Sequence, residues 1–355
     1  MERRKIRGCL SLFLTSAVNM SFVSHLIQPK GRTVDLKKIG VATTGGDAPG
    51  MNAAIRAIVR LAASRNLEVV GFQRGWQGLM EDESRPLTPR SVGGILQLGG
   101  TILHTARSPE FATKRGVKKA AQTLSNNKID GLVVIGGNGS FNGALDLSRA
   151  TDTLIVGVPA TIDNDVYGTD ETIGFDTAVN TAVSDIDKIR DTAISHERTF
   201  IVEVMGRTRG FLALTAGLTA GAEIIIVPEI KSNRENIFQT LKENSRKGKK
   251  SSIIVKAEGA GDAGLLAKEI EGRTGAEVRI SVLGYAQRGG SPTARSRLLA
   301  SLFGSRTVEL LLDGQGNRIV GLQNGQTSNM SLEKSCKTEK PLDLSMRLLA
   351  NVPAA

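Results

Sequence analysis

The sequence predicts an α/β protein with two lobes, each built on a mainly parallel sheet. Short Val- and Ile-rich runs alternate with helical patterns along most of the 355 residues, which is the order that βαβ units produce. The run GLVVI at 131–135 is almost continuously apolar, as a strand covered on both faces of a parallel sheet requires. With 40% hydrophobic residues, a chain of this length can bury more than one core.

The pattern of each segment indicates its element. Apolar residues at helical spacing, such as Ile55 and Ile58 within 51–64, predict a helix, and short β-branched runs predict strands. In chain order, strands are expected at 38–42, 67–72, 131–135, 154–158, 200–205, 224–227 and 253–255, and helices at 51–64, 142–149, 177–190, 212–220 and 234–246. The segment 327–355 is weakly patterned.

Charge and composition limit the kinds of function that this chain can have. The net charge is +11, but residues 1–38 contribute +6 of it. Only 4% of the residues are aromatic, so the composition argues against nucleic acid as a partner and favours small anionic ligands. No run reaches the roughly 20 apolar residues of a membrane span. The two cysteines, Cys9 and Cys336, lie near opposite ends, which gives no disulfide framework and fits a cytoplasmic location.

Residues 1–36 are expected to be an N-terminal extension. The basic start and the apolar run at 9–14 superficially resemble a short secretory signal. The run is short, however, and it is interrupted by Ser and Thr. We expect a loosely ordered tail or an over-extended gene start.

Two carboxylates, Asp163 and Asp165, directly follow the apolar run at 154–158. One of them can accept a proton from a substrate hydroxyl while the other orients a metal or an amide. The chain has only three histidines, so a His base has few candidates. An aspartate base suits phosphoryl transfer, which depends on positioning and charge neutralisation. The alternative is an Asx-rich turn that caps the next helix.

Glycine-rich turns follow two of the expected strands, at 45–47 and at 136–140. Glycine lets backbone N–H groups approach phosphate oxygens, and the next helix adds the positive end of its dipole. A tight strand-to-helix turn that needs glycine for a positive φ would show the same pattern.

Taken in order, the motifs of this chain resemble those of the 6-phosphofructokinase family, in its bacterial-type, ATP-dependent branch. They are TTGGDAPGMN at 43–52, GGT at 99–101 with ARSPEF at 106–111, GGNGS at 136–140, PATIDND at 159–165, EVMGR at 203–207 and QRGGSP at 287–292. The resemblance spans about 37–326. It implies a glycolytic kinase that uses ATP and Mg²⁺ to phosphorylate fructose 6-phosphate to fructose 1,6-bisphosphate. It further implies a homo-oligomer, most simply a tetramer.

The resemblance also implies two Rossmann-like lobes formed by discontinuous domains. The nucleotide-binding lobe would be 37–174 plus 287–337, and the sugar-phosphate-binding lobe 175–286 plus 338–355.

By the same resemblance, Asp163 takes the proton of the sugar 1-hydroxyl, and Thr161, Arg107 and Arg207 complete the catalytic set. The nucleotide site comprises Gly45, Arg107, Ser108, Gly137, Asn138, Gly139 and Ser140, with Asn138 also at the magnesium position. The sugar-phosphate site comprises Thr161, Asp163, Asp165, Arg198, Met205, Gly206, Arg207, Glu258, Arg279, Tyr285 and Arg288, two of the arginines coming from an adjacent subunit. An effector site comprises Arg56, Arg60, Arg190, Glu223, Lys247 and Lys249, with a solvated basic surface as the alternative.

Some positions depart from the family pattern. Asn138 replaces an aspartate and removes one negative charge from a hard-cation site, so Asp163 or Asp165 with phosphate oxygens is an alternative holder of the ion. Gly139 and Ala160 leave room for ATP, where pyrophosphate-using relatives carry an aspartate and a lysine.

Two further departures lie nearer the expected sugar-phosphate site. Tyr285 replaces a histidine and has no cationic form at pH 7. The segment 293–297 loses an acid and gains a cation. Two other functions therefore stay open: a pyrophosphate-dependent enzyme, or a catalytically weak homologue that binds sugar phosphate or nucleotide as a regulatory subunit.

Overall fold

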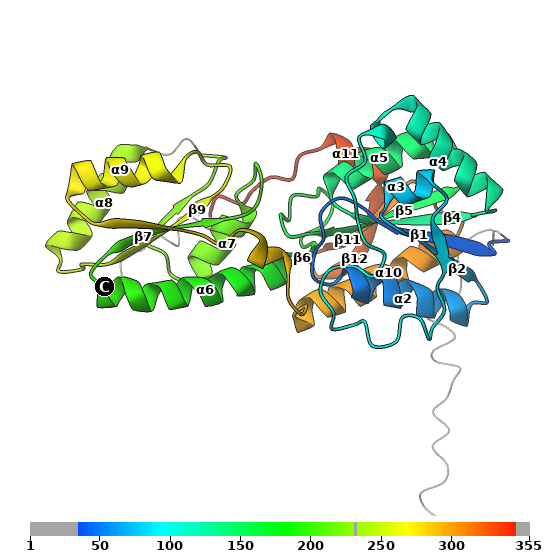
Figure 1. The fold of residues 1–355 in the computed structure, drawn as a ribbon, viewed down its shortest axis with the longest axis horizontal. Coiled ribbons are helices and arrows are strands. Elements are labelled where there is room, and N and C mark those ends of the chain that lie inside the picture. Colours follow the sequence, from blue (N-terminus) through cyan, green and yellow to red (C-terminus); the bar gives the residue numbers. More distant parts are fainter. Residues whose placement is uncertain (1–34, 231–232, 346–355) are drawn as a thin grey trace, which may run out of the picture.

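Two separate sheets organise the chain (Figure 1), in a computed structural model that describes residues 35–230 and 233–345. The larger sheet comprises β1 (Lys38–Thr43), β2 (Glu68–Phe72), β3 (Ser84–Pro86), β4 (Gly131–Gly136), β5 (Leu154–Thr161), β6 (Ile173–Gly174), β11 (Arg318–Gln323) and β12 (Gln326–Ser331). Its order is β12-β11-β5-β4-β1-β2-β3, with β6 paired to β5. The pairs are parallel except β2 with β3 and β11 with β12, at the two edges.

Helices cover both faces of the larger sheet. One face carries α2 (Met51–Ser64) and α10 (Ala294–Leu312), and the other carries α3 (Trp76–Met80), α4 (Lys114–Asn126), α5 (Asn138–Ser148) and α11 (Leu332–Lys337). Successive residues of β4 point to opposite faces, so Val133 packs in the core beside α2 and Val134 in the core beside α5. Because β4 is buried along its whole length, its sequence is apolar throughout.

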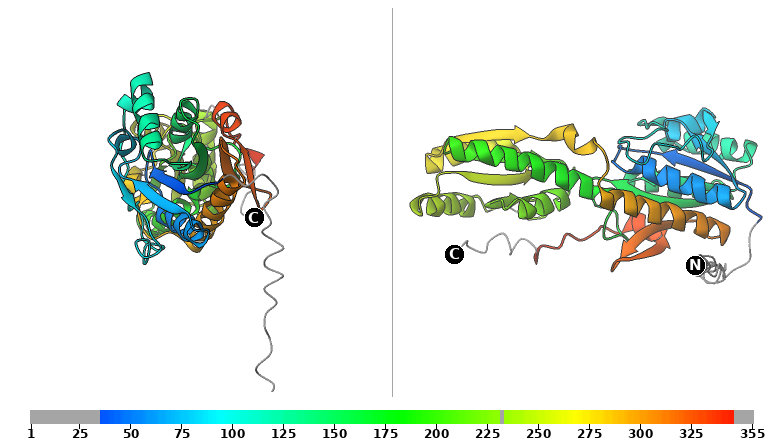
Figure 2. Two further views of the ribbon diagram at one scale, coloured as in Figure 1. Left: turned by 90° about the vertical axis from the view of Figure 1, so that its right-hand side faces the viewer. Right: turned by 90° about the horizontal axis from the view of Figure 1, so that it is seen from below.

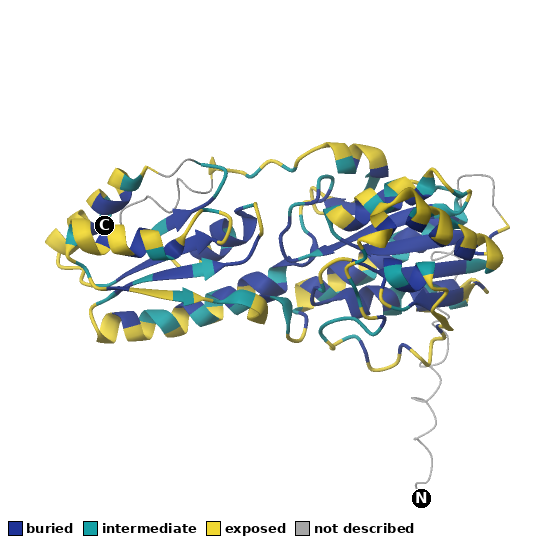
Figure 3. Cartoon of the chain, turned by 45° about the horizontal axis from the view of Figure 1, so that its top comes forward, coloured by how far each residue is buried: buried dark blue, intermediate teal, exposed yellow. Residues whose placement is uncertain are grey.

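The smaller sheet repeats this arrangement with parallel strands. Its order is β10-β7-β9-β8, formed by β7 (Thr199–Val204), β8 (Ile224–Ile226), β9 (Ser252–Ala257) and β10 (Val278–Val282). The helices α6 (Phe175–Ser195) and α7 (Phe211–Thr219) pack on one face, and α8 (Arg234–Arg246) and α9 (Ala263–Thr274) on the other. Figure 3 shows the buried strands beneath helices whose outer faces are exposed.

The chain passes repeatedly between the two lobes (Figure 2). It leaves the larger lobe after β6, forms the smaller sheet, and returns through the short helix η2 (Gly284–Arg288) to α10. Beyond α11, the segment 338–345 runs back toward the smaller lobe. The region between the lobes is therefore lined by segments that are far apart in the sequence.

The predicted α/β class with mainly parallel sheets is confirmed, and each expected strand and helix is present within a few residues of its expected bounds. Two differences stand out. Helix α5 begins at Asn138, directly after the glycine turn and four residues before the expected start at 142. The strand β12, which begins at Gln326, and the helix α11 form in and next to the weakly patterned segment 327–355, where QTSNMS lacks the apolar alternation that marks a half-buried strand.

The expected N-terminal extension lies almost entirely outside the described residues. Leu36, at its end, is buried in the core of the larger lobe. In the ranges that the structure describes, no helix is both long and apolar enough to cross a bilayer.

Candidate active site

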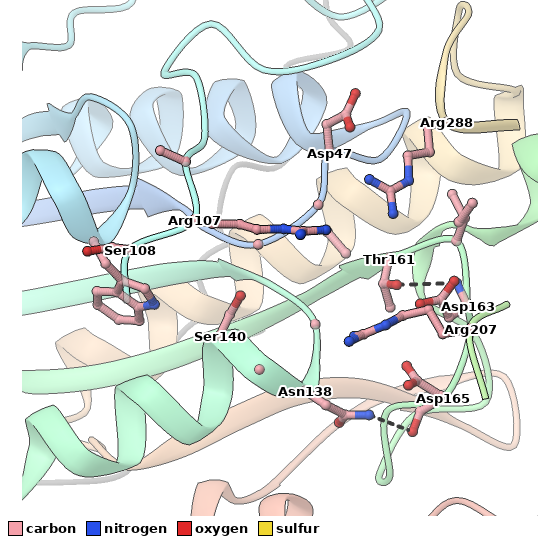
Figure 4. A pocket seen from close by; sticks show the side chains of 18 of the residues that line it. Asp47, Arg107, Ser108, Asn138, Ser140, Thr161, Asp163, Asp165, Arg207 and Arg288 are labelled. Atoms are coloured by element: carbon pink, nitrogen blue, oxygen red, sulfur yellow. Dashed lines mark hydrogen bonds between the residues drawn. The ribbon is translucent and has the colours of Figure 1, made fainter. Parts of the chain in front are cut away.

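A pocket of about 550 Å³ lies at the carboxyl ends of β1, β4 and β5, where adjacent parallel strands open a crevice. The guanidinium groups of Arg107, Arg207 and Arg288 point into it (Figure 4). Of the predicted site residues it gathers Gly45, Arg107, Ser108, Gly137, Asn138, Gly139, Ser140, Thr161, Asp163, Asp165, Arg207 and Arg288.

Glycine backbone forms one wall of the pocket. Ser140 donates a hydrogen bond from Oγ to the carbonyl oxygen of Thr44 (3.0 Å), which joins the first turn of α5 to the turn after β1. Gly45 has a φ of 82°, and a Cβ on Gly136 would collide with Ser140 Oγ. The two turns therefore pack closely only with glycine at these positions, and backbone is what they present to a ligand.

The first turn of α5 completes this wall. Apart from its chain neighbours and the backbone of its own helix, a Cβ added to Gly139 would meet no described atom within 4 Å, so this position opens onto free space. Asn138 donates from Nδ2 to the backbone carbonyl oxygen of Asp165 (3.1 Å). The asparagine thus ties the helix to the loop that carries the two acids.

The loop that carries Arg107 is fastened to the end of β1. Asn52, buried in α2, donates to the Gly99 carbonyl (3.0 Å) and accepts from the Ile102 N–H (2.7 Å). Thr105 Oγ1 donates to the Gly45 carbonyl (2.8 Å). These contacts hold the loop beside the glycine turns at 45–47 and 136–140, which together are called the glycine wall.

Trp76 lines the pocket and is absent from the sequence-based predictions. Its indole stacks on the ring of Phe111, with centroids 4.2 Å apart and planes 3° from parallel. Phe111 belongs to the motif at 106–111, but Trp76 stands alone after the second strand. Its being the only tryptophan of the chain is the one signal that could have singled it out.

The loop at 162–172, called the acid loop because it carries Asp163 and Asp165, is shaped by Asn164. This residue is buried and has a φ of 51°. Its Oδ1 accepts from the Thr172 N–H (3.0 Å), and its Nδ2 donates to the Asp170 carbonyl (3.2 Å). Asn164 therefore makes the turn contacts, which leaves the flanking Asp163 and Asp165 to line the pocket.

Asp163 is only 6% exposed, and its N–H donates to Thr161 Oγ1 (3.2 Å). Burial raises the pKa of Asp163 to about 6, and the neighbouring Asp165 adds to the rise. The positive charges of Arg207 and Arg288 oppose this rise in the pKa of Asp163. The carboxylate is thus poorly solvated but lies within the field of two cations.

The smaller lobe contributes Arg207, which follows β7 and has a φ of 55°, uncommon for a non-glycine residue. Its N–H and that of Gly206 both donate to Glu258 Oε1, at 2.5 and 3.2 Å. The N–H of Met205 lies 3.4 Å from Gln287 Oε1. The predicted residue Glu258 therefore fixes the backbone of Gly206 and Arg207, and Gln287 contacts that of the predicted residue Met205.

Comparison with known proteins shows which family the chain belongs to. A family model described as Phosphofructokinase matches residues 38–311. The chain belongs to the phosphofructokinase family. The "ATP-dependent 6-phosphofructokinase" of Oceanobacillus iheyensis is 52% identical over 315 residues, which cover 89% of this chain and 98% of the relative. The "ATP-dependent 6-phosphofructokinase 1" of Thermus thermophilus is 52% identical over 322 residues, which cover 90% and 100%.

Solved phosphofructokinases share the fold. The phosphofructokinase of Saccharomyces cerevisiae aligns with a TM-score of 0.79 and 35% identity over 85% of this chain, which corresponds to 45% of that longer chain. The pyrophosphate-dependent phosphofructokinase of Marinobacter aquaeolei aligns with a TM-score of 0.77 at 23% identity, over 87% of this chain and 86% of its own.

Six predicted phosphofructokinase sugar-phosphate residues do not line the pocket: Met205, Gly206 and Glu258, which lie next to Arg207 in sequence or contact its backbone, and the more distant Arg198, Arg279 and Tyr285. Arg198 directly precedes β7 and Arg279 lies on the adjacent β10, and both pair with Glu277. The strand β7 lies between Arg198 and Met205 and separates them by about 23 Å, at roughly 3.3 Å for each of the seven steps along the chain. Tyr285 is 78% exposed, with the Arg288 guanidinium 5.5 Å from its ring centroid.

The predicted effector residues fall into two groups. Glu223 accepts a hydrogen bond from Lys249 Nζ (2.5 Å), lies 3.4 Å from Arg190 Nη1, and is nearly buried. Lys247 lies next to this cluster in sequence, at the end of α8. Arg56 and Arg60 lie on α2 in the larger lobe. Within one chain, these six residues do not form one site.

The cation gained in the segment 293–297 is neutralised locally. Arg295 makes a bidentate contact with Glu171, at 2.9 and 2.7 Å. This pairing stabilises the Arg295 guanidinium in its charged form and raises its pKa. The added charge therefore ties α10 to the acid loop and is not directed to the pocket.

The donor set around Asn138 fits a magnesium ion that arrives with phosphate. In the described part of the chain, no three His, Cys, Asp or Glu side chains are grouped so as to hold a metal ion. Mg²⁺ commonly binds through few protein oxygens and completes its shell with phosphate and water. The pocket offers the Asn138 amide oxygen for such a shell.

We expect Asp163→Asn to raise thermal stability in ligand-free, metal-free buffer. The folded pKa of about 6 exceeds the ordinary value of 3.8, so the folded state binds the proton more tightly. The carboxylate therefore costs stability as pH rises from about 4 to about 6, and the cost persists above that range. The neutral amide avoids it.

The predicted gain over wild type is about 3 kcal/mol at pH 8, and roughly half of that at pH 5, because each pKa unit corresponds to about 1.36 kcal/mol. Thermal unfolding at both pH values measures it, with the exposed Asp152→Asn as control. A variant less stable than wild type at pH 8 would contradict this account of the carboxylate.

Proposed function

We propose that this chain is an ATP-dependent 6-phosphofructokinase that transfers the γ-phosphoryl group of ATP to the 1-hydroxyl of fructose 6-phosphate. One observation carries the proposal: the buried Asp163 shares a pocket with two glycine turns of the phosphate-binding type and with three inward-pointing arginines. The names of the relatives support the same reaction.

Asp163 is the proposed general base. It takes the proton of the 1-hydroxyl as that oxygen attacks the γ-phosphorus, while the bond to the β-bridging oxygen breaks and ADP leaves. Little proton abstraction is needed before bond breaking in a loose transition state, so position matters most. Thr161, which accepts the Asp163 N–H, orients this loop. Arg107 and Arg207 stabilise charge on the transferring group.

The nucleotide is proposed to lie on the glycine wall, with its phosphates near Gly45, Gly137 and Ser140 and beside Arg107 and Ser108. Gly139 opens onto free space, and Ala160 carries no charge. Both features favour ATP over pyrophosphate as donor. Mg²⁺ would be held by phosphate oxygens and the Asn138 amide oxygen, and it would neutralise phosphate charge.

The sugar phosphate is proposed to lie toward the smaller lobe, near Asp165, Arg288 and the Met205–Glu258 side of the pocket. The larger sheet (37–174 plus 287–337) is then the nucleotide lobe, and the smaller one (175–286 plus 338–355) the sugar-phosphate lobe. Both lobes act on one phosphoryl group between them.

A homo-oligomer, most simply a tetramer in the cytoplasm, is proposed to complete the site. Arg198 and Arg279 lie too far from their own pocket to reach it, so they would serve a neighbouring subunit together with Tyr285. The edge strand β10 supports association, because it exposes 42% of Ile280 and 63% of Val282. The separated effector residues on α2 and near Glu223 would likewise meet across subunits.

The wild-type protein should phosphorylate fructose 6-phosphate with ATP and Mg²⁺ and show little turnover with pyrophosphate. Steady-state rates with each donor, with and without Mg²⁺, measure this. Faster turnover with pyrophosphate would reassign the donor. Tight binding of both ATP and fructose 6-phosphate without product would instead indicate a regulatory subunit.

Asp163→Asn should lower kcat by about 10²–10⁴-fold, because the amide cannot accept the proton. The affinity for ATP should change little, since the glycine wall is intact. Initial-rate kinetics measure the loss, and the exposed Asp152→Asn variant controls for a change of charge. Full activity in Asp163→Asn would exclude this residue as the base.

Asn138→Asp should lower the Mg²⁺ concentration needed for half-maximal activity several-fold, because it adds a negative charge to the ion's shell. It should also cost about 1 kcal/mol of stability, since a carboxylate cannot donate to the Asp165 carbonyl. Magnesium titrations and thermal unfolding test both effects. Asn142→Asp, exposed on the same helix, is the matched control. An unchanged magnesium requirement would place the ion elsewhere.

A further inference from the structure

Lys340 belongs to the segment 338–345, which runs from α11 toward the smaller lobe (Figure 1). Its ammonium group donates to the backbone carbonyl of Asp170 in the larger lobe, at 2.9 Å. Its own carbonyl accepts from Nη2 of Arg209 in the smaller lobe, at 2.5 Å. A single residue therefore contacts both lobes.

On the larger lobe, Lys340 contacts the acid loop. The Asp170 carbonyl that it binds also accepts from Nδ2 of Asn164, the residue next to Asp163. The Asp170 N–H donates to the Leu322 carbonyl (2.7 Å), which fixes this peptide to β11. Lys340 is thus joined to the loop of the proposed base through one shared oxygen.

On the smaller lobe, Lys340 and Arg209 pack around Phe211, which is buried at the start of α7. The ring centroid of Phe211 lies 5.0 Å from the ammonium of Lys340 and 5.6 Å from the guanidinium of Arg209. Arg209 is held further by Glu229, at 3.1 Å. The contacts therefore place Arg209 and the lysine firmly against the lobe.

The same arginine belongs to the loop of Arg207. The Arg209 N–H donates to the Gly206 carbonyl (2.9 Å), and the N–H groups of Gly206 and Arg207 share Glu258. Lys340 is thus connected to the Arg207 loop through Arg209, as it is connected to the Asp163 loop through Asp170.

The ammonium group is costly to bury, which argues that its place is specific. Burial lowers the pKa of Lys340 to about 8, against the opposing effect of the Asp170, Asp165 and Glu171 carboxylates. A lysine that only solubilised the surface would extend into water. By contrast, Lys337 on α11 is exposed and pairs with Glu333 one turn away.

We propose that Lys340 is a positioning residue that ties the Asp163 loop to the Arg207 loop and so sets the spacing of base and cation across the pocket. This inference rests on the proposed kinase reaction. Without the tie, each lobe still binds its own ligand, but the reacting groups lose their alignment. A displacement of about 1 Å lowers a rate by roughly 100-fold.

Lys340→Met is expected to lower kcat by about 10-fold or more, while the dissociation constants of ATP and of fructose 6-phosphate, each measured alone, stay within about twofold of wild type. Lys337→Met, the matched control, leaves kcat unchanged. Arg209→Met cuts the other end of the tie and lowers kcat similarly. Since both variants break one connection, the double variant is no worse than the more impaired single.

Hydrogen–deuterium exchange of the ligand-free protein supplies a readout that needs no turnover. Lys340→Met should speed exchange in both 164–172 and 205–211, and Lys337→Met in neither. If the methionine variant does not fold, Lys340→Gln, which removes the charge, takes its place in every assay.

Unchanged kcat, additive losses in the double variant, or faster exchange confined to one loop would each overturn the proposal. If wild-type protein does not use ATP, the proposed function fails, while the exchange experiment still decides whether Lys340 joins the loops.

Discussion

One buried carboxylate and the cations that face it depend on the arrangement of both lobes. Asp163 has little access to water and lies two residues from a second acid, so its charge is stabilised mainly by Arg207 and Arg288. Arg207 follows β7 in the smaller lobe, and Arg288 ends η2, where the chain returns to the larger lobe. The carboxylate and one of its counter-charges, Arg207, thus come from opposite lobes, and this part of the environment of Asp163 exists only while the lobes keep their relative positions.

Much of the fold and pocket could be predicted because the decisive residues are close together in the sequence. Strands such as β4 are covered on both faces, which makes them continuous apolar runs, and the carboxyl end of each is marked by glycines or acids. The pocket residues from these turns were therefore found by motif. Trp76 has no such neighbours, and its stacking on Phe111 depends on the packing of α3.

The contacts of Lys340 could not be predicted for a different reason. Arg209 lies 131 residues and Asp170 lies 170 residues from it in sequence, and the C-terminal segment has no periodic pattern. The positions of Arg198 and Arg279 at the far end of the smaller sheet likewise follow from strand direction. The sequence motifs do not indicate in which direction these strands run relative to the pocket.

The consequences of single departures from the family pattern can be judged only from the residues that they contact in the structure. Arg295 looked like an added cation near the sugar phosphate, yet Glu171 binds it in a bidentate pair. Asn138 looked like the loss of a charge, yet its amide donates to the Asp165 carbonyl, which a carboxylate cannot do. The effect of each substitution therefore depends on the residue that the new side chain contacts.

Trp76 gives the protein a built-in optical label. It is the chain's sole indole, it is shielded from water, and it lies flat against Phe111 on the pocket wall. All tryptophan emission from the intact molecule therefore originates at one known place. Quenching or a spectral shift on mixing would report occupancy of the cleft directly, with no dye attached and no residue altered.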